Sequence, residues 1–131
     1  MNISLIGYGK MGKEIEKAAV ERGHSVHLTI DIDNIDDLKS DKFKSSDMAI
    51  EFTNPSSVLN NLSACFDAGV PVVTGTTGWH DDINKVIDGL KNIKNIDRIT
   101  TILILIKKEI KIISIKDIRR DDYSALIGKG S

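Results

Sequence analysis

Cysteine and proline are scarce in this chain of 131 residues, which contains one cysteine and two prolines. The lone thiol of Cys65 excludes an internal disulfide, and Cys65 does not combine with the three histidines in the spacing of a zinc site. No metal site is therefore expected. The sequence also lacks a long apolar run, and residues 1–7 lack the basic start of a signal peptide. These absences predict a cytoplasmic protein with no membrane partner.

A large net charge is missing as well. Eighteen lysine and arginine residues against 19 aspartate and glutamate residues give a net charge of −1, which argues against nucleic acid as a partner. The hydrophobic fraction of 40% is typical of one globular domain. Residues 1–92 hold 9 basic against 14 acidic residues, whereas residues 93–131 hold 9 against 5. We therefore divide the chain into a domain of residues 1–92 and an isoleucine- and lysine-rich tail of residues 93–131.

Short apolar segments alternate with segments of helical periodicity through the first 92 residues. The expected strands are residues 3–6, 26–30, 48–52 and 70–74. The expected helices run from Met11 to Gly23, from Asn54 and Pro55 to Gly69, and over 81–90, with a short helix over 35–38. This alternation predicts an α/β fold of the Rossmann type, with a doubly wound parallel sheet.

The tail contains two further apolar runs, over 99–106 and 110–115. They predict an antiparallel hairpin at the edge of the sheet, or one edge strand and a separate segment. An isoleucine-rich strand of this kind is an aggregation hazard unless it is paired. We therefore expect it to pair within the fold, or in a homo-oligomer through the C-terminal strands.

A glycine-rich turn follows the first expected strand and precedes the first expected helix. It reads Gly7-Tyr8-Gly9-Lys10-Met11-Gly12, the G-x-G-x-x-G spacing of dinucleotide-binding domains. In that pattern Gly7 permits the tight turn, Gly9 lets the backbone approach a pyrophosphate, and Gly12 allows close packing of helix on strand. Backbone N–H groups from Gly9 to Gly12 would hold the phosphates. The alternative is a glycine turn in an α/β domain that binds no nucleotide.

Asp31 ends the second expected strand, 19 residues after Gly12. A carboxylate at this position accepts hydrogen bonds from the adenosine ribose hydroxyls and repels a 2′-phosphate. No arginine follows it immediately, since the next residues are Ile32 and Asp33, so NAD(H) is favoured over NADP(H), although Lys39 or Lys42 could fold back toward a phosphate. Asp33 competes for the ribose role, and a solvated carboxylate without a ligand is the other alternative.

The fourth expected strand ends in the string Thr74-Gly75-Thr76-Thr77-Gly78-Trp79, in which Gly75 to Gly78 form a threonine-containing loop after the strand. Ligands of parallel sheets bind at the carboxyl ends of strands, so the hydroxyls and glycines of this loop are placed to line a nicotinamide-ribose site. The same residues would also serve as an N-terminal cap for the helix expected over 81–90. Spacing alone leaves both interpretations open.

Three strings in this order resemble the N-terminal half of the 4-hydroxy-tetrahydrodipicolinate reductase (dihydrodipicolinate reductase) family: Gly7 to Gly12, Glu51-Phe52-Thr53-Asn54-Pro55, and Thr74 to Trp79. The resemblance covers residues 1–92 and favours the nicotinamide interpretation of the threonine loop. It implies that NAD(P)H contacts Gly7, Tyr8, Gly9, Lys10, Met11, Gly12, Asp31, Gly75, Thr76 and Thr77, with Phe52 and Thr53 near the cofactor. It also implies hydride transfer to a cyclic imine-type dicarboxylate in lysine and diaminopimelate synthesis, usually by a homotetramer.

The family carries its chemistry in a second domain, whose motifs are missing from this sequence. The His-His pair, the neighbouring lysine and the Asp-Ala-Pro-Ser-Gly-Thr loop have no counterpart, because all three histidines lie within residues 1–92 and the prolines are Pro55 and Pro71. No catalytic residue is therefore assigned, and we expect cofactor binding with impaired or absent turnover. The alternatives are a non-enzymatic NAD-binding or regulatory module, and a remnant whose tail pairs with another chain.

Overall fold

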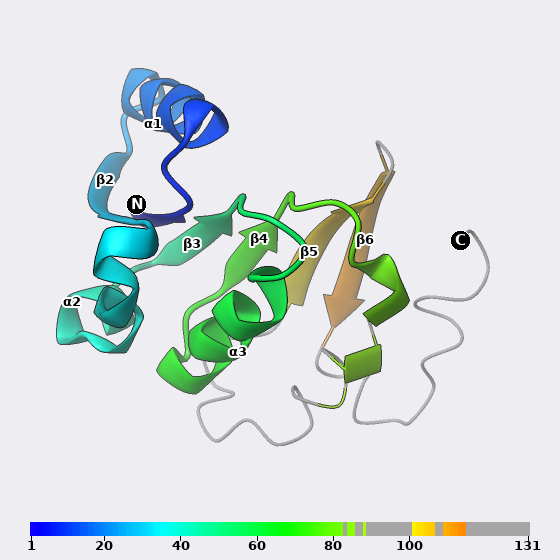
Figure 1. The fold of residues 1–131 in the computed structure, drawn as a ribbon. Helices are drawn as coiled ribbons and strands as arrows, with labels where there is room; N and C mark the ends of the chain where they lie inside the picture. Colours follow the sequence, from blue (N-terminus) through cyan, green and yellow to red (C-terminus); the bar gives the residue numbers. More distant parts are fainter. Residues whose placement is uncertain (83, 86–87, 89–100, 107–108, 115–131) are drawn as a thin grey trace.

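The computed structural model describes residues 1–82, 84, 85, 88, 101–106 and 109–114, and it has the predicted α/β architecture (Figure 1). The strands are β1 (Asn2–Ile6), β2 (Ser25–Ile30), β3 (Met48–Glu51), β4 (Val72–Thr74), β5 (Thr101–Ile106) and β6 (Glu109–Ser114). The helices are α1 (Lys10–Glu21), α2 (Asp41–Lys44) and α3 (Val58–Ala68), with 3₁₀ helices η1 (Ile32–Lys39) and η2 (His80–Asp82). Within the helix expected over 81–90, residues 84, 85 and 88 are helical, and residues 83, 86, 87, 89 and 90 lie outside the described part.

The six strands form one sheet in the order β2-β1-β3-β4-β5-β6. Pairing is parallel from β2 through β5, and β6 runs antiparallel to β5, as the hairpin expected in the tail requires. The chain moves from β1 to β2 on one side and then crosses to β3 on the other. The strand order therefore reverses between β1 and β3, and doubly wound sheets bind their ligands at the carboxyl ends of the strands at such a point.

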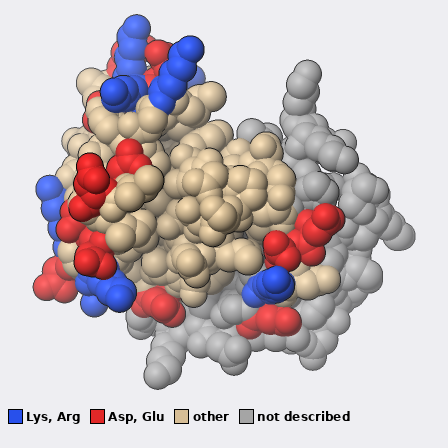
Figure 2. Space-filling model, in the orientation of Figure 1, with Lys and Arg blue, Asp and Glu red and all other residues tan. Residues whose placement is uncertain are grey.

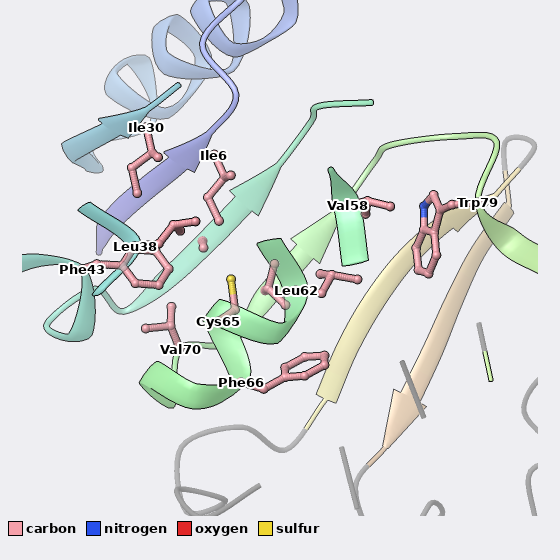
Figure 3. Close-up of a cluster of buried hydrophobic side chains, with 12 residues drawn as sticks. Ile6, Ile30, Leu38, Phe43, Val58, Leu62, Cys65, Phe66, Val70 and Trp79 are labelled. Carbon is pink, nitrogen blue, oxygen red and sulfur yellow. The ribbon is translucent and has the colours of Figure 1, made fainter. Parts of the chain in front are cut away.

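Helices cover both faces of the sheet, because side chains alternate between the two sides of each strand. On one face, Ile3 and Leu5 of β1 pack with Ala19 of α1. On the other face, Ile6 and Ile30 join a larger cluster (Figure 3). That cluster takes side chains from η1, α2, α3 and the loop after β4, namely Leu38, Phe43, Val58, Leu62, Cys65, Phe66 and Trp79. The polar stretch after β2, for which the sequence predicts only a short helix, thus supplies two core residues, Leu38 and Phe43.

The third helix begins later than the sequence predicts. Asn54 and Pro55 are favourable residues for a helix start, but α3 begins at Val58 with Ser57 as its N-cap. The Asn54 side-chain oxygen instead accepts a hydrogen bond from the backbone N–H of Ser56, at 3.1 Å. The backbone carbonyl of Asn54 accepts hydrogen bonds from the N–H groups of Ser57 and Val58. Asn54 therefore caps the turn that leads into the helix, and the expected boundary was wrong by one turn.

Cys65 lies on α3 and has no exposed surface. Burial raises the pKa of its thiol, and the negative charge of Glu51 raises that pKa further. The thiolate is the reactive form of cysteine, so a thiol held protonated in the core is inert. Cys65 is a packing residue in the described structure.

Candidate cofactor-binding site

A cleft of about 270 Å³ opens at the carboxyl ends of β1, β2 and β3, where the strand order reverses. The turn after β1, the end of β2 and the segment from β3 into α3 form its walls. The lining residues are Ile6, Gly7, Tyr8, Gly9, Ile30, Asp31, Ile32, Ile35, Phe52, Thr53, Asn54, Ser57 and Asn61. The cleft therefore occupies the position at which doubly wound sheets bind nucleotides.

Half of the predicted cofactor residues line this cleft. They are Gly7, Tyr8, Gly9, Asp31, Phe52 and Thr53. Lys10, Met11, Gly12, Gly75, Thr76 and Thr77 are not among the residues that line it. Sequence reasoning did not identify four further lining residues, the apolar Ile32 and Ile35 and the polar Ser57 and Asn61, because nothing in their local sequence pattern marks them as part of a site.

The glycine turn has the geometry that its spacing predicts. Gly7 has a φ of +96°, and a Cβ at this position would lie 1.9 Å from the carbonyl oxygen of Phe52. A Cβ on Gly12 would lie 2.5 Å from the carbonyl oxygen of Gly7, so α1 packs directly against the turn. A Cβ on Gly9 would have nothing within 4 Å. Gly9 therefore leaves open space in the cleft, and the fold itself does not need a glycine there.

The start of α1 is electrostatically suited to an anion. Gly9 is the N-cap of α1, and no side chain caps its first turn. The first N–H groups of a helix lack partners within the helix and carry partial positive charge. Lys10 and Lys13 lie in the first two turns of α1, and Figure 2 shows basic side chains, with acidic ones among them, at the top of the view above an uncharged central face.

Asp31 occupies the end of β2 in the wall of the cleft. Its Oδ1 accepts a hydrogen bond from the N–H of Ile32 at 2.9 Å, and its own N–H donates to Asn34 Oδ1 at 2.8 Å. This reciprocal cap starts η1 and holds the carboxylate at the cleft while the side chain stays exposed. Asp33, the competing candidate for the ribose role, is not among the residues that line the cleft.

Tyr8 closes the cleft beside α1. Its hydroxyl donates to Glu16 Oε1 at 2.6 Å, and Lys13 Nζ lies 5.8 Å from the centre of its ring. The hydrogen bond to Glu16, with desolvation and the charge of that carboxylate, raises the pKa of the Tyr8 phenol. The Tyr8 phenol therefore lines the site in its neutral form, and Glu16 of α1 holds it in place.

Glu51, the last residue of β3, is a carboxylate with 0% exposed surface. Its Oε1 accepts hydrogen bonds from the hydroxyls of Thr74 and Thr76, at 2.6 and 2.7 Å. Its Oε2 accepts from the Thr53 hydroxyl and from Asn61 Nδ2. We call these four donors the Glu51 cage. All four partners donate and an ionised carboxylate only accepts, so the cage satisfies a buried negative charge.

The cage changes the interpretation of the threonine loop. The Thr76 hydroxyl faces Glu51 and not the cleft, and Thr76 is 4% exposed. The indole N–H of Trp79 donates to the Thr76 carbonyl at 2.6 Å. Gly75 lies under the Phe52 ring, where a Cβ would be 1.9 Å from Phe52 Cζ. Thr77 is exposed. The loop therefore supports the Phe52 wall of the cleft from behind, and its direct contact with a cofactor stays a prediction.

The signal for the Glu51 cage is present in the sequence but was not recognised. Glu51 is an acidic residue within the otherwise apolar run from Met48 to Phe52, and such a charge in a buried strand needs compensating donors. Threonines lie at or just after the ends of β3 and β4, as Thr53, Thr74 and Thr76. Adjacent parallel strands bring their carboxyl ends together, so this pattern indicates a shared network.

The described residues offer neither a metal site nor a membrane span. No three histidine, cysteine, aspartate or glutamate side chains gather there to hold a metal ion. No helix in the described part of the chain is long and apolar enough to cross a membrane.

The parallel sheet, the glycine turn and the cleft at the strand reversal define a Rossmann-type α/β domain. Residues 1–103 match the family model described as "Dihydrodipicolinate reductase, N-terminus". The chain therefore belongs to the dihydrodipicolinate reductase family and corresponds to its N-terminal, NAD(P)-binding domain.

Several relatives carry the name 4-hydroxy-tetrahydrodipicolinate reductase. The protein of Christiangramia forsetii is 42% identical over 85 residues, covering 65% of this chain and 35% of the relative. That of Bifidobacterium longum subsp. infantis is 37% identical over 83 residues, covering 63% and 33%. That of Bifidobacterium animalis subsp. lactis is 34% identical over 99 residues, covering 74% and 39%. The chain thus spans only about a third of the length of these relatives.

Proposed function

We propose that this chain binds NAD(P)H in the cleft between β1 and β3, and that it supplies the cofactor side of the reduction for which its relatives are named. The observation that carries the proposal is the placement of the open Gly9 turn and of Asp31 in one cleft. A pyrophosphate fits against Gly9 at the start of α1, where unpaired N–H groups bind anions. The ribose of the adenosine then reaches Asp31 at the end of β2.

We further propose that NAD(H) is preferred to NADP(H). The Asp31 carboxylate faces the position of the ribose 2′-oxygen in this arrangement and repels a phosphate there. The next residue, Ile32, is 86% exposed and cannot pair with a phosphate as an arginine would. Lys39, the basic residue of η1, ends that element with an exposed side chain and is its candidate for a phosphate contact.

The variant Asp31→Asn tests the cofactor site and the preference together. Asparagine keeps an oxygen to cap η1 but removes the charge. We expect NADH affinity to fall about 10-fold, because a charge-assisted hydrogen bond becomes a neutral one, and NADPH affinity to fall less or to rise. Isothermal titration calorimetry with both cofactors measures the two dissociation constants. Asp33→Asn is the matched control, since Asp33 is exposed and does not line the cleft.

Failure of the unchanged chain to bind NADH at millimolar concentration would contradict the cofactor proposal. Equal effects of the Asp31 and Asp33 variants would contradict the assignment of Asp31. A retained preference for NADH in Asp31→Asn would show that another group selects the cofactor.

We infer that the substrate side of the reaction lies outside the described residues. Hydride transfer also requires a group that orients the substrate and a proton donor. The titratable side chains that line the cleft are Tyr8 and Asp31, and both lie beside the proposed dinucleotide positions. We therefore expect this chain by itself to bind NADH without oxidising it when the dicarboxylate substrate is added.

An NADH-oxidation assay with freshly generated substrate tests this expectation and separates the two candidate functions. Turnover by the chain alone would contradict the inference that substrate groups lie elsewhere. Binding without turnover also fits a non-enzymatic NAD-binding module, the second candidate. Restoration of turnover by an added substrate domain of a relative would favour the enzymatic function over that module.

A further inference from the structure

The loops that follow β3 and β4 are joined by a short chain of hydrogen bonds. The Thr53 N–H donates to Thr76 Oγ1 at 2.8 Å, and the Thr76 hydroxyl donates to Glu51 Oε1 at 2.7 Å. Thr53 lines the cleft, whereas Glu51 and Thr76 are buried behind it. The chain of hydrogen bonds therefore connects the wall of the cleft to a buried carboxylate.

We propose that Glu51 is a positioning residue for the cofactor: acting through Thr76, it fixes the loop after β3 so that Phe52 and Thr53 form the wall of the cleft. The inference rests on the proposed function, since it assigns a role toward the same cofactor. Glu51 itself is fully buried and is not among the residues that line the cleft.

The direction of the hydrogen bonds gives Glu51 this role. A threonine hydroxyl has one proton, and Glu51 takes the proton of Thr76. The lone pairs of that oxygen are then directed at the Thr53 N–H. Without the carboxylate the Thr76 hydroxyl rotates freely, and the Thr53 N–H loses a fixed acceptor. The buried charge therefore sets the orientation of a hydroxyl that holds the backbone of the cleft.

The position of Phe52 has little tolerance for movement of this loop. A Cβ on Gly7 would lie 1.9 Å from the Phe52 carbonyl oxygen, and a Cβ on Gly75 would lie 1.9 Å from its ring. Phe52 thus fits between two glycines, with its N–H bonded to the Ile6 carbonyl at 2.9 Å. A small displacement of the loop moves this aromatic wall relative to Gly9 and Asp31, the residues proposed to hold the other end of the cofactor.

Thr74 provides an internal control for the proposal. Its hydroxyl also donates to Glu51 Oε1, at 2.6 Å, and its side chain has 0% exposure. It lies within β4, paired in register with Glu51, and its hydroxyl is not bonded to Thr53. Loss of either threonine hydroxyl removes one buried donor to Glu51, but only the loss of the Thr76 hydroxyl also removes the acceptor of the Thr53 N–H in the wall of the cleft.

The experiment compares the full chain with the variants Thr76→Val, Thr74→Val and Thr76→Ser. Calorimetric titration with NADH gives affinities, urea unfolding gives stabilities, and amide hydrogen exchange reports the Thr53 N–H. We expect Thr76→Val to bind NADH about 10-fold more weakly and to exchange the Thr53 amide faster, since one buried hydrogen bond of the cleft wall is lost. We expect Thr74→Val to change the affinity less than about 3-fold despite a similar loss of stability, and Thr76→Ser to bind as the unchanged chain does.

Equal losses of affinity in Thr74→Val and Thr76→Val would overturn the proposal, because they would show a general effect of stability. Unchanged affinity in a folded Thr76→Val variant, or weak binding by Thr76→Ser, would also overturn it. If valine at position 76 prevents folding, Glu51→Gln is measured in its place and the same loss of affinity is expected. No binding by the unchanged chain would refute the proposed function itself, and this inference with it.

Discussion

The variant Gly9→Val is expected to lose NADH binding almost completely while keeping its fold. Gly9 has a φ of −85° and a ψ of −153°, an extended conformation that any residue adopts, and a Cβ there meets no atom within 4 Å. The valine side chain would instead occupy the space proposed for the pyrophosphate at the start of α1. We expect the dissociation constant for NADH to rise at least about 100-fold, and the free energy of unfolding to fall by about 1 kcal/mol at most, since valine is a poor N-cap.

Gly23→Ala is the matched control for this prediction. A Cβ on Gly23 would also have nothing within 4 Å, but its φ is +83° and it follows the end of α1, far along the chain from the turn. We expect this variant to lose stability, about 1 kcal/mol, because alanine is strained at positive φ, and to bind NADH normally. Calorimetry and urea unfolding measure both quantities. Tight NADH binding by Gly9→Val would exclude the cleft as the pyrophosphate site.

The variant Gly7→Ala is expected to lose folding stability, and not only NADH binding. Its φ of +96° disfavours any residue with a Cβ, and that Cβ would lie 1.9 Å from the Phe52 carbonyl oxygen. Backbone strain costs about 1–3 kcal/mol, and overpacking costs about 1–3 kcal/mol. We therefore expect the free energy of unfolding to fall by about 3 kcal/mol, a large part of the roughly 5–15 kcal/mol typical of a domain.

Urea unfolding followed by circular dichroism measures this loss, with Gly9→Ala as the control. Both variants add one methyl group to the same turn, but the Gly9 position is open and the Gly7 position is not. A stability loss below about 1 kcal/mol in Gly7→Ala would show that the turn relaxes at little cost. It would also show that the close approach of β1 and β3 is not required.

The glycine turn and the positions of the first four strands along the chain were predictable because their signals are local. Gly7 and Gly12 are required by a conformation and a contact within one turn, and apolar periodicity marks each strand and helix directly. Boundaries were predicted less well. Asn54 and Pro55 are good residues for a helix start, yet α3 begins at Val58, because the Asn54 side chain caps a preceding turn instead. Several conformations satisfy the same capping residues, and the surrounding packing selects one.

The threonine loop shows why part of the site required the structure. The hydroxyls of Thr76 and Thr77 were expected to face a cofactor, but the Thr76 hydroxyl donates to Glu51, which lies 25 residues earlier in the chain. The resemblance to dihydrodipicolinate reductases associated this loop with the cofactor without showing which atoms it serves. In the structure it holds Phe52 from behind through Gly75 and holds Thr53 through Thr76.

The sequence by itself determined a Rossmann-type domain, a dinucleotide turn from Gly7 to Gly12 and the candidate ribose ligand Asp31, because each depends on residues close together in the chain. Only the tertiary structure decided which of the predicted residues form the cleft and which support it. The physical reason is that the pairing of β3 with β4 brings Glu51 beside Thr74 of β4 and Thr76 of the loop that follows. The buried carboxylate accepts hydrogen bonds from the hydroxyls of Thr74 and Thr76, so the Thr76 hydroxyl faces Glu51 and not the cleft.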